Sequence, residues 1–386
     1  MGLAAYLALK EVWRNRLRFL LVSMVIALIT LLVLFIAALG EGLGNGNKEF
    51  IAKVDAQLIV YQADSDFVVP SSRLGRDRLA AVRRVDGVAD AGPLGASNTE
   101  IILADGRDPL KVAMLGVEPG RPGEPPVTAG RQLSTDLARE VIIDRNTALR
   151  SKLQVGDLLT IRVTQGTRET FYELRVVGIT DGRQYSIQPS IIVPFFTWDR
   201  VRTKSEAEVQ NPNPVANVIL VRLSDPAQAE AVSARLTAQV NDVEVATITQ
   251  AIAAVPGYTA QQSTISTQGV FTLLIGVLVI GGFFQIQILQ KVPQIGVLKA
   301  IGAANFVVAA ASVIQIVVVT AIGVAIGGGL TYLFSLSFPP TVPIVFNGVN
   351  SALAVVALLL IGPLGGLVSI RYAVGIEPLK ALGLAS

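Results

Sequence analysis

Apolar positions are concentrated in three stretches of this chain that contain no charged residue. They run from Phe19 to Gly40, from Val245 to Gln290 and from Ala300 to Ile370, and the last comprises 71 residues without a Lys, Arg, Asp or Glu. A soluble domain must hydrate its surface throughout, so gaps of this length are not expected in one. The pattern therefore predicts membrane-spanning segments.

The number of spans follows from the thickness of a bilayer, which requires about 20 apolar residues per helix. We predict spans at residues 19–40 and 270–290, and we divide the longest uncharged stretch at its proline-containing sequence FPPTVPIVFNG. This division gives a third span at 306–334, an outer loop at 335–350 and a fourth span at 351–370. The first apolar run is too long for the h-region of a signal peptide, which favours a retained span over a cleaved one.

The segment between the first two spans, residues 41–267, has the composition of a soluble domain. It contains 24 of the 32 basic residues and 27 of the 29 acidic residues, and its roughly 200 residues are enough to bury a core. The other flanks of the spans, at 1–18, 291–304 and 371–386, carry a net excess of Lys and Arg. By the positive-inside rule, we expect a multi-pass protein of the cell (inner) membrane with both termini in the cytoplasm and the large domain outside.

The residues ahead of the first span predict an amphipathic helix over 1–18. Apolar and basic side chains recur there at helical spacing on two different faces. Such a helix lies on the inner leaflet before the chain enters the bilayer. The apolar positions are Tyr6, Leu9, Trp13 and Leu17, and the basic ones are Lys10, Arg14 and Arg18.

The large domain alternates strand-like and helix-like segments. We predict an αβ lobe from about 55–120 and 215–250, and a mainly β lobe at about 125–205 inserted into it. The predicted strands include AQLIVY, EVIID, LLTIRVT, FYELRVVGI, NVILVRL and VEVATI. The expected fold class is therefore a membrane protein of four transmembrane helices plus a large extracytoplasmic α+β domain of two lobes, inserted between the first and second spans.

The residue types that carry most enzyme chemistry are missing. The sequence contains no Cys and no His, which excludes Cys/His zinc sites, CxxC redox pairs and Ser/His or Cys/His nucleophilic catalysis. The GxxxxGK[ST] phosphate-binding loop is also absent. Asp64 and Asp66 are the nearest thing to a carboxylate pair, and we interpret them as a turn at a strand end. We therefore expect no catalytic, cofactor-binding or metal-ligating residue in this chain.

A small-residue motif, Gly323 to Gly327, lies within the predicted third span and is followed by Gly328 and Gly329. Glycines at this spacing allow two helices to approach closely. We expect packing within the four-helix unit rather than a seam between two copies.

The short loop after the second span reads KVPQIGVLKAIGAANF, which is too apolar for a plain linker. It resembles the cytoplasmic signature of MacB/FtsX-type ABC permeases, in which a basic residue and Glu-Ile-Gly precede a Leu-Lys-Ala-Ile-Gly-Ala stretch. The N-terminal LALKEVWRNRLRFLL, the C-terminal RYAVGIEPLKALG and the segment GRQLSTDLAREVIIDRNTALRSKLQVGDLLTI are similar to further parts of that family. The resemblance covers essentially the whole chain, although Gln294, preceded by Pro293, replaces the usual Glu.

The resemblance implies a permease subunit without its own ATPase domain, close to DevC-like or lipoprotein-release permeases. Such a subunit works as a homodimer with two copies of a separate ABC ATPase, and ATP and Mg are held by that partner. The loop at 291–304 would be the coupling helix that contacts the ATPase; the alternative is a loop packed on its own membrane domain. The positions assigned to the contact are Gln294, Ile295, Gly296, Leu298, Lys299, Ala300, Ile301 and Gly302.

The resemblance also implies transmission of motion to the outer domain, which drives export or extraction of a hydrophobic substrate, peptide or lipoprotein. The absence of ionisable residues within the spans agrees with this, because paths for ions and charged solutes are generally lined by such groups. The alternative is an FtsX-like signalling scaffold that regulates a cell-wall hydrolase without transport, and a membrane-anchored enzyme is a third reading. A membrane-fusion adaptor or outer-membrane component is a further expected partner, and nucleic acid is not.

Overall fold

The chain divides into two compact units, each of which is described by itself. They are Met1–Gly42 with Gln262–Ser386, and Leu43–Gln261. The computed structural model describes residues 2–103, 106–210, 214–338, 344–346 and 348–375. Parts of the predicted outer loop and most of the predicted C-terminal tail lie outside these residues.

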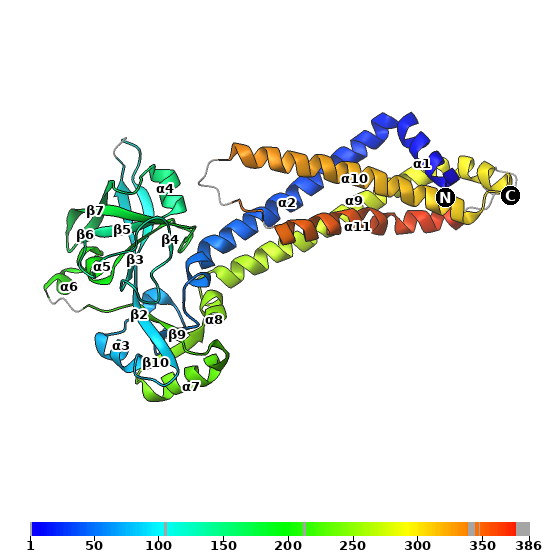
Figure 1. Ribbon diagram of the computed structural model, residues 1–386. Helices are drawn as coiled ribbons and strands as arrows, with labels where there is room; N and C mark the ends of the chain where they lie inside the picture. The colour runs from blue at the N-terminus through cyan, green and yellow to red at the C-terminus, as the bar shows by residue number, and fades with distance from the viewer. Residues whose placement is uncertain (1, 104–105, 211–213, 339–343, 347, 376–386) are drawn as a thin grey trace. The chain divides into compact units, whose positions relative to one another are not determined.

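The first unit is built from long helices that lie side by side (Figure 1). Four of them are long and apolar enough to cross a membrane, and they contain the four predicted spans. The predicted amphipathic segment forms α1, and α2 begins two residues after it ends. The helices are α1 (Gly2–Arg14), α2 (Arg16–Ala52), α9 (Tyr258–Ala300), α10 (Asn305–Ser337) and α11 (Gly348–Gly375).

Helix α9 differs from the prediction in one respect. A separate coupling helix was expected after a span at 270–290, but α9 continues unbroken to Ala300 and includes Pro293. Packing of its last turns against α10 and α11 stabilises these residues as helix, although proline removes one backbone hydrogen bond. The predicted loop at 291–304 is thus the last ten residues of α9, nearly three turns, followed by a short connection.

The membrane helices pack through glycines, as the small-residue motif predicts. A Cβ atom on Gly323 would lie 2.6 Å from the side chain of Ile26 in α2, and one on Gly327 would lie 2.5 Å from the carbonyl oxygen of Ala27. The motif therefore contacts α2 of the same chain, which confirms packing within the unit. A cluster of buried apolar side chains from α2, α9, α10 and α11 forms the core of this unit.

The second unit contains one mixed sheet with strand order β10-β1-β9-β2-β3-β8-β5-β7-β4, in which β6 pairs with β2 and β7. The long hairpin of β2 and β3 is antiparallel, whereas β3 and β8 run parallel. The strands are β1 (Leu58–Gln62), β2 (Val88–Ile102), β3 (Leu110–Val117), β4 (Val127–Gly130), β5 (Glu140–Asp144), β6 (Leu158–Gln165), β7 (Arg168–Thr180), β8 (Ser190–Pro194), β9 (Val218–Leu223) and β10 (Val243–Thr247).

The two predicted lobes share this sheet. The five strands from β10 to β3 come from the segments assigned to the αβ lobe, and the rest come from the segment assigned to the β lobe. The β3–β8 pairing joins them, so the sheet is continuous. Short helices accompany the strands: η1 (Val69–Ser71), α3 (Arg76–Val82), α4 (Arg145–Ser151), α5 (Phe195–Val201), α6 (Glu206–Gln210), η2 (Pro226–Gln228), α7 (Ala229–Gln239) and α8 (Ile248–Ala253).

Trp198 of α5 anchors that helix on the sheet beside the β3–β8 junction. Its ring lies against Gly95 of β2 and Gly116 of β3, where any side chain would overlap it. The indole Nε1 donates a hydrogen bond to Ser97 Oγ at 2.9 Å. The two glycines thus make room for the largest side chain in this part of the core.

The pair Asp64 and Asp66 lies in a turn after β1, as predicted. Both residues have positive φ angles, of 61° and 53°. Such left-handed backbone is tolerated by Asp in turns. The pair is therefore a structural feature of the turn.

Candidate functional site

The end of α9 is closed by a glycine in the left-handed conformation. Gly302 has a φ angle of +99°, and its N–H donates to the carbonyl of Lys299 at 3.0 Å, while Ala303 N–H donates to the carbonyl of Leu298 at 3.1 Å. This is the Schellman arrangement, which favours glycine at the first position beyond the helix. It fixes the direction of the chain between α9 and α10, which begins three residues later.

One face of the last turns of α9 packs on the membrane unit itself. Ile295 and Leu298 are half-buried against a small cluster formed by Ile288, Val308 and Ala373. Lys299 Nζ donates a hydrogen bond to the carbonyl oxygen of Val374 in α11 at 2.6 Å. These contacts hold the end of α9 against α10 and α11.

A neighbouring face of the same turns is exposed and carries large apolar side chains. Val297 is 45% exposed, Ile301 81% and Phe306 66%. Positions 294, 297 and 301 follow helical spacing and lie on one side of α9. We call this face the exposed turn surface, and it consists of Gln294, Val297, Ala300, Ile301, Gly302 and Phe306.

The structure divides the eight residues assigned to the ATPase contact into two groups. Gln294, Ala300, Ile301 and Gly302 lie on the exposed turn surface, whereas Ile295, Gly296, Leu298 and Lys299 are half-buried or buried in the membrane unit. The sequence interpretation did not include Val297 and Phe306, which contribute large exposed side chains. Helical spacing of i, i+3 and i+7 from Gln294 to Ile301 could have predicted that Val297 lies on the same face.

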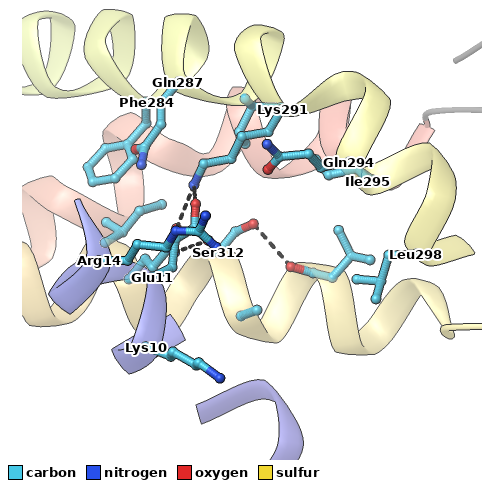
Figure 2. Close-up of a pocket in the computed structure, with 15 residues that line it drawn as sticks. Lys10, Glu11, Arg14, Phe284, Gln287, Lys291, Gln294, Ile295, Leu298 and Ser312 are labelled. Carbon is cyan, nitrogen blue, oxygen red and sulfur yellow. Dashed lines mark hydrogen bonds and ion pairs between the residues drawn. The ribbon is translucent and has the colours of Figure 1, made fainter. Parts of the chain in front are cut away.

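A polar cluster next to this surface fixes α1 to the bundle. Lys291 of α9 forms an ion pair with Glu11 of α1, and Gln315 of α10 donates a hydrogen bond to Glu11 at 2.6 Å. Lys291 also donates to Gln315 at 3.4 Å. The cluster therefore connects three helices, α1, α9 and α10, near the end of α9 (Figure 2).

These features define a class of protein: a multi-pass α-helical membrane protein with a large mixed-sheet domain inserted after the first membrane helix. Residues 19–239 match a family model described as the MacB-like periplasmic core domain. Residues 267–378 match one described as the FtsX-like permease C-terminal. The first match alone covers more than half of the chain, which therefore belongs to the MacB/FtsX family of ABC transporter permeases.

Full-length relatives agree with this assignment. The "Putative hemin transport system permease protein HrtB" of Staphylococcus epidermidis is 23% identical over 382 residues, covering 98% of this chain and 99% of the relative. An uncharacterized ABC transporter permease of Mycobacterium tuberculosis is 26% identical over 394 residues, with the same coverage.

Two solved structures show a weaker likeness. One is the extracellular domain of the ABC-type transporter YknZ from Gram-positive bacteria, at 13% identity and a TM-score of 0.36, covering 50% of this chain and 100% of that structure. The other is the periplasmic region of MacB from Actinobacillus actinomycetemcomitans, at 12% identity and a TM-score of 0.37, covering 52% and 93%. At these scores the likeness carries no argument of its own.

Proposed function

We propose that this chain is the permease subunit of a complex in which a separate ABC ATPase binds the exposed turn surface. The observation that carries the proposal is the exposure of Val297, Ile301 and Phe306 around a turn held by backbone hydrogen bonds. Large exposed apolar side chains on both sides of one short turn, with a polar neighbour such as Gln294, are typical of protein interfaces. Two permease copies would present two such surfaces to two ATPase copies.

The position of the turn along α9 supports a protein partner over lipid. The uncharged part of α9 ends at Lys291, and Lys299 follows two turns later. Because a charged side chain is costly within hydrocarbon, we infer from these lysines that the end of α9 lies at or beyond the membrane boundary. By the positive-inside rule, that boundary faces the cytoplasm, where the ATPase would be.

The lengths of α2 and α9 support a transmission of motion. α2 has 37 residues and α9 has 43, which correspond to lengths of about 55 Å and 65 Å. The hydrocarbon core of a bilayer is only about 30 Å thick. Both helices therefore extend well beyond the core, and we infer that they act as levers that carry movement of the ATPase to the inserted domain.

The substrate class that we propose is a hydrophobic or amphipathic molecule exported or extracted from the membrane. The staphylococcal relatives are named for hemin transport, which favours transport over the signalling-scaffold alternative. This chain has no His and no Cys. If its substrate were a metalloporphyrin, the iron would have no imidazole or thiolate ligand from this chain. Tyr or Met side chains, the apolar ring and the carboxylates would remain for recognition.

The proposal is tested by replacing Ile301 with Asp in the chain co-expressed and purified with a candidate ABC ATPase subunit. Leu149→Asp, which changes an exposed leucine of α4 in the inserted domain, is the matched control. We expect Ile301→Asp to abolish co-purification and stimulation of ATP hydrolysis, and Leu149→Asp to preserve both. Full stimulation by Ile301→Asp would contradict the assignment of the surface.

A second measurement distinguishes transport from scaffolding. Cells that lack the chain are compared with wild-type cells for their sensitivity to hydrophobic compounds, including hemin. The same cells are examined for cell-wall and division defects. Increased sensitivity with normal division supports export. Normal sensitivity with a division defect supports the FtsX-like scaffold.

A further inference from the structure

A cavity of about 330 Å³ lies between α1, α9 and α10. Figure 2 shows residues of all three helices around it. Its volume is within the range of small-molecule sites, about 300–1,000 Å³. Its lining combines charged and amide side chains with apolar ones, a mixture that suits an amphipathic ligand.

The polar side of the cavity carries more positive than negative charge. Its ionisable residues are Lys10, Glu11, Arg14 and Lys291. The Glu11 carboxylate is already used by Lys291 and Gln315. Lys10 interacts with the Tyr6 hydroxyl at 3.1 Å, and among the described residues Arg14 has no acidic partner within ion-pairing distance. Two cations thus remain for an anionic ligand.

Gln287 is a second, independent indication of a ligand. Its side chain lines the cavity and is 2% exposed, yet neither its Nε2 nor its Oε1 has a hydrogen-bond partner among the described residues. Leaving a buried amide unpaired costs about 1–3 kcal/mol per group. A ligand with both hydrogen-bond donors and acceptors would remove this cost.

On the hydrocarbon side of Lys291, the apolar side of the cavity is formed by Phe284 and Ile288 of α9 and by Ile316 of α10. Ile295, Leu298 and Val308 line the cavity beyond Lys291. Phe284 and Ile288 precede Lys291 in α9, and the stretch before Lys291 is uncharged, so both lie on its hydrocarbon side. Measured along the helix axis, they are about 10 Å and 4.5 Å from Lys291. The cavity therefore extends across the depth at which a phospholipid changes from headgroup to acyl chain.

We propose that this cavity binds an anionic phospholipid of the leaflet in which α1 lies. The phosphate would meet Lys10 and Arg14, the glycerol and ester groups would face Gln287, and the first acyl carbons would contact the apolar side. Because Gln294, Ile295 and Leu298 also line the cavity, the bound lipid would stabilise the end of α9 that carries the exposed turn surface.

The test is native mass spectrometry of the detergent-purified full chain. It is titrated with dioleoyl phosphatidylglycerol, with dioleoyl phosphatidylcholine, and with phosphatidylglycerol in the presence of millimolar inorganic phosphate. The variants are Arg14→Gln, Lys10→Gln with Arg14→Gln, and Gln287→Leu. Arg371→Gln is the control, because it removes an exposed cation of α11 that does not line the cavity.

We expect one phosphatidylglycerol molecule to bind per chain, more tightly than phosphatidylcholine. Free phosphate should not change the affinity for phosphatidylglycerol. Each lost cation should weaken binding about fivefold, and Gln287→Leu should weaken it without lowering the temperature of unfolding. Arg371→Gln should bind as the wild type does. Any one of four results would overturn the proposal. The two lipids bind equally well, or Arg14→Gln and Arg371→Gln have equal effects. Alternatively, Gln287→Leu binds as the wild type does, or inorganic phosphate competes with the lipid.

Discussion

The contact between α9 and α11 depends on two glycines and gives a quantitative prediction. A Cβ atom on Gly281 of α9 would lie 2.7 Å from the carbonyl oxygen of Gly365 in α11, and one on Gly365 would lie 2.6 Å from the carbonyl oxygen of Val277. Both neighbours are backbone atoms, so a side-chain rotation cannot relieve the overlap. We predict that Gly281→Ala forces the two helices apart.

The adjacent Gly282 provides a matched control. A Cβ atom there would have no heavy atom within 4 Å. Both substitutions gain the same intrinsic helix propensity, about 1 kcal/mol, so that gain cancels between them. Overpacking typically costs about 1–3 kcal/mol. Gly281→Ala should therefore be less stable than Gly282→Ala by about that amount.

The measurement is the loss of helical circular dichroism when the chain in mild detergent is titrated with SDS. Gly281→Ala should unfold at a lower SDS fraction than Gly282→Ala, which should unfold at or above the wild-type fraction. In a Trp13→Phe background, which removes the other tryptophan of the chain, the fluorescence of Trp198, which is buried in the inserted domain, checks that the domain itself is unchanged. Equal unfolding midpoints for the two variants would refute the close packing of α9 and α11.

Three further predictions concern single side chains. Trp198→Ala should destabilise the inserted domain by about 3–5 kcal/mol, measured by thermal unfolding of the full chain. A hydrogen bond from the backbone N–H of Ser205, together with the positive charge of Arg202, lowers the pKa of Glu208 from 4.5 to about 2. The stability gained from this carboxylate is present above about pH 4.5 and lost as the pH falls through about 2, so Glu208→Gln should unfold more easily at pH 7 and lose less stability on acidification. Glu11→Gln should destabilise the membrane unit by about 1–3 kcal/mol, because it leaves the Lys291 ammonium group without its carboxylate partner. The double mutant Glu11→Gln with Lys291→Met should recover part of this lost stability.

The spans could be predicted because the bilayer imposes a strong and local constraint. Uncharged stretches of sufficient length identify all four long helices, and the Gly323 to Gly327 motif correctly predicts close packing within the unit. Most strands of the inserted domain could also be placed from local patterns, but β4 and β8 were not among the predicted segments. The parallel pairing of β3 with β8 could not, because it joins segments about 75 residues apart and leaves no local signal.

The coupling segment shows the other limit of sequence reasoning. Its composition indicated a functional helix, but not that α9 would continue through Pro293 to its end. Nor could the sequence decide which apolar residues face outward, because Ile295 and Leu298 pack on α10 and α11 while Val297 and Ile301 do not. That division depends on helices that are distant in sequence.

The most direct test of the central proposal uses the absence of cysteine in the natural sequence. Ile301→Cys and Leu298→Cys each introduce a single thiol, the first on the exposed turn surface and the second on the half-buried face of the same helix end. Each variant is labelled with a short photo-crosslinker, combined with the ATPase subunit and irradiated. We predict an efficient crosslink to the ATPase from position 301 and little from position 298. No crosslink from 301, or equal crosslinking from both, would contradict the binding of the ATPase to this surface.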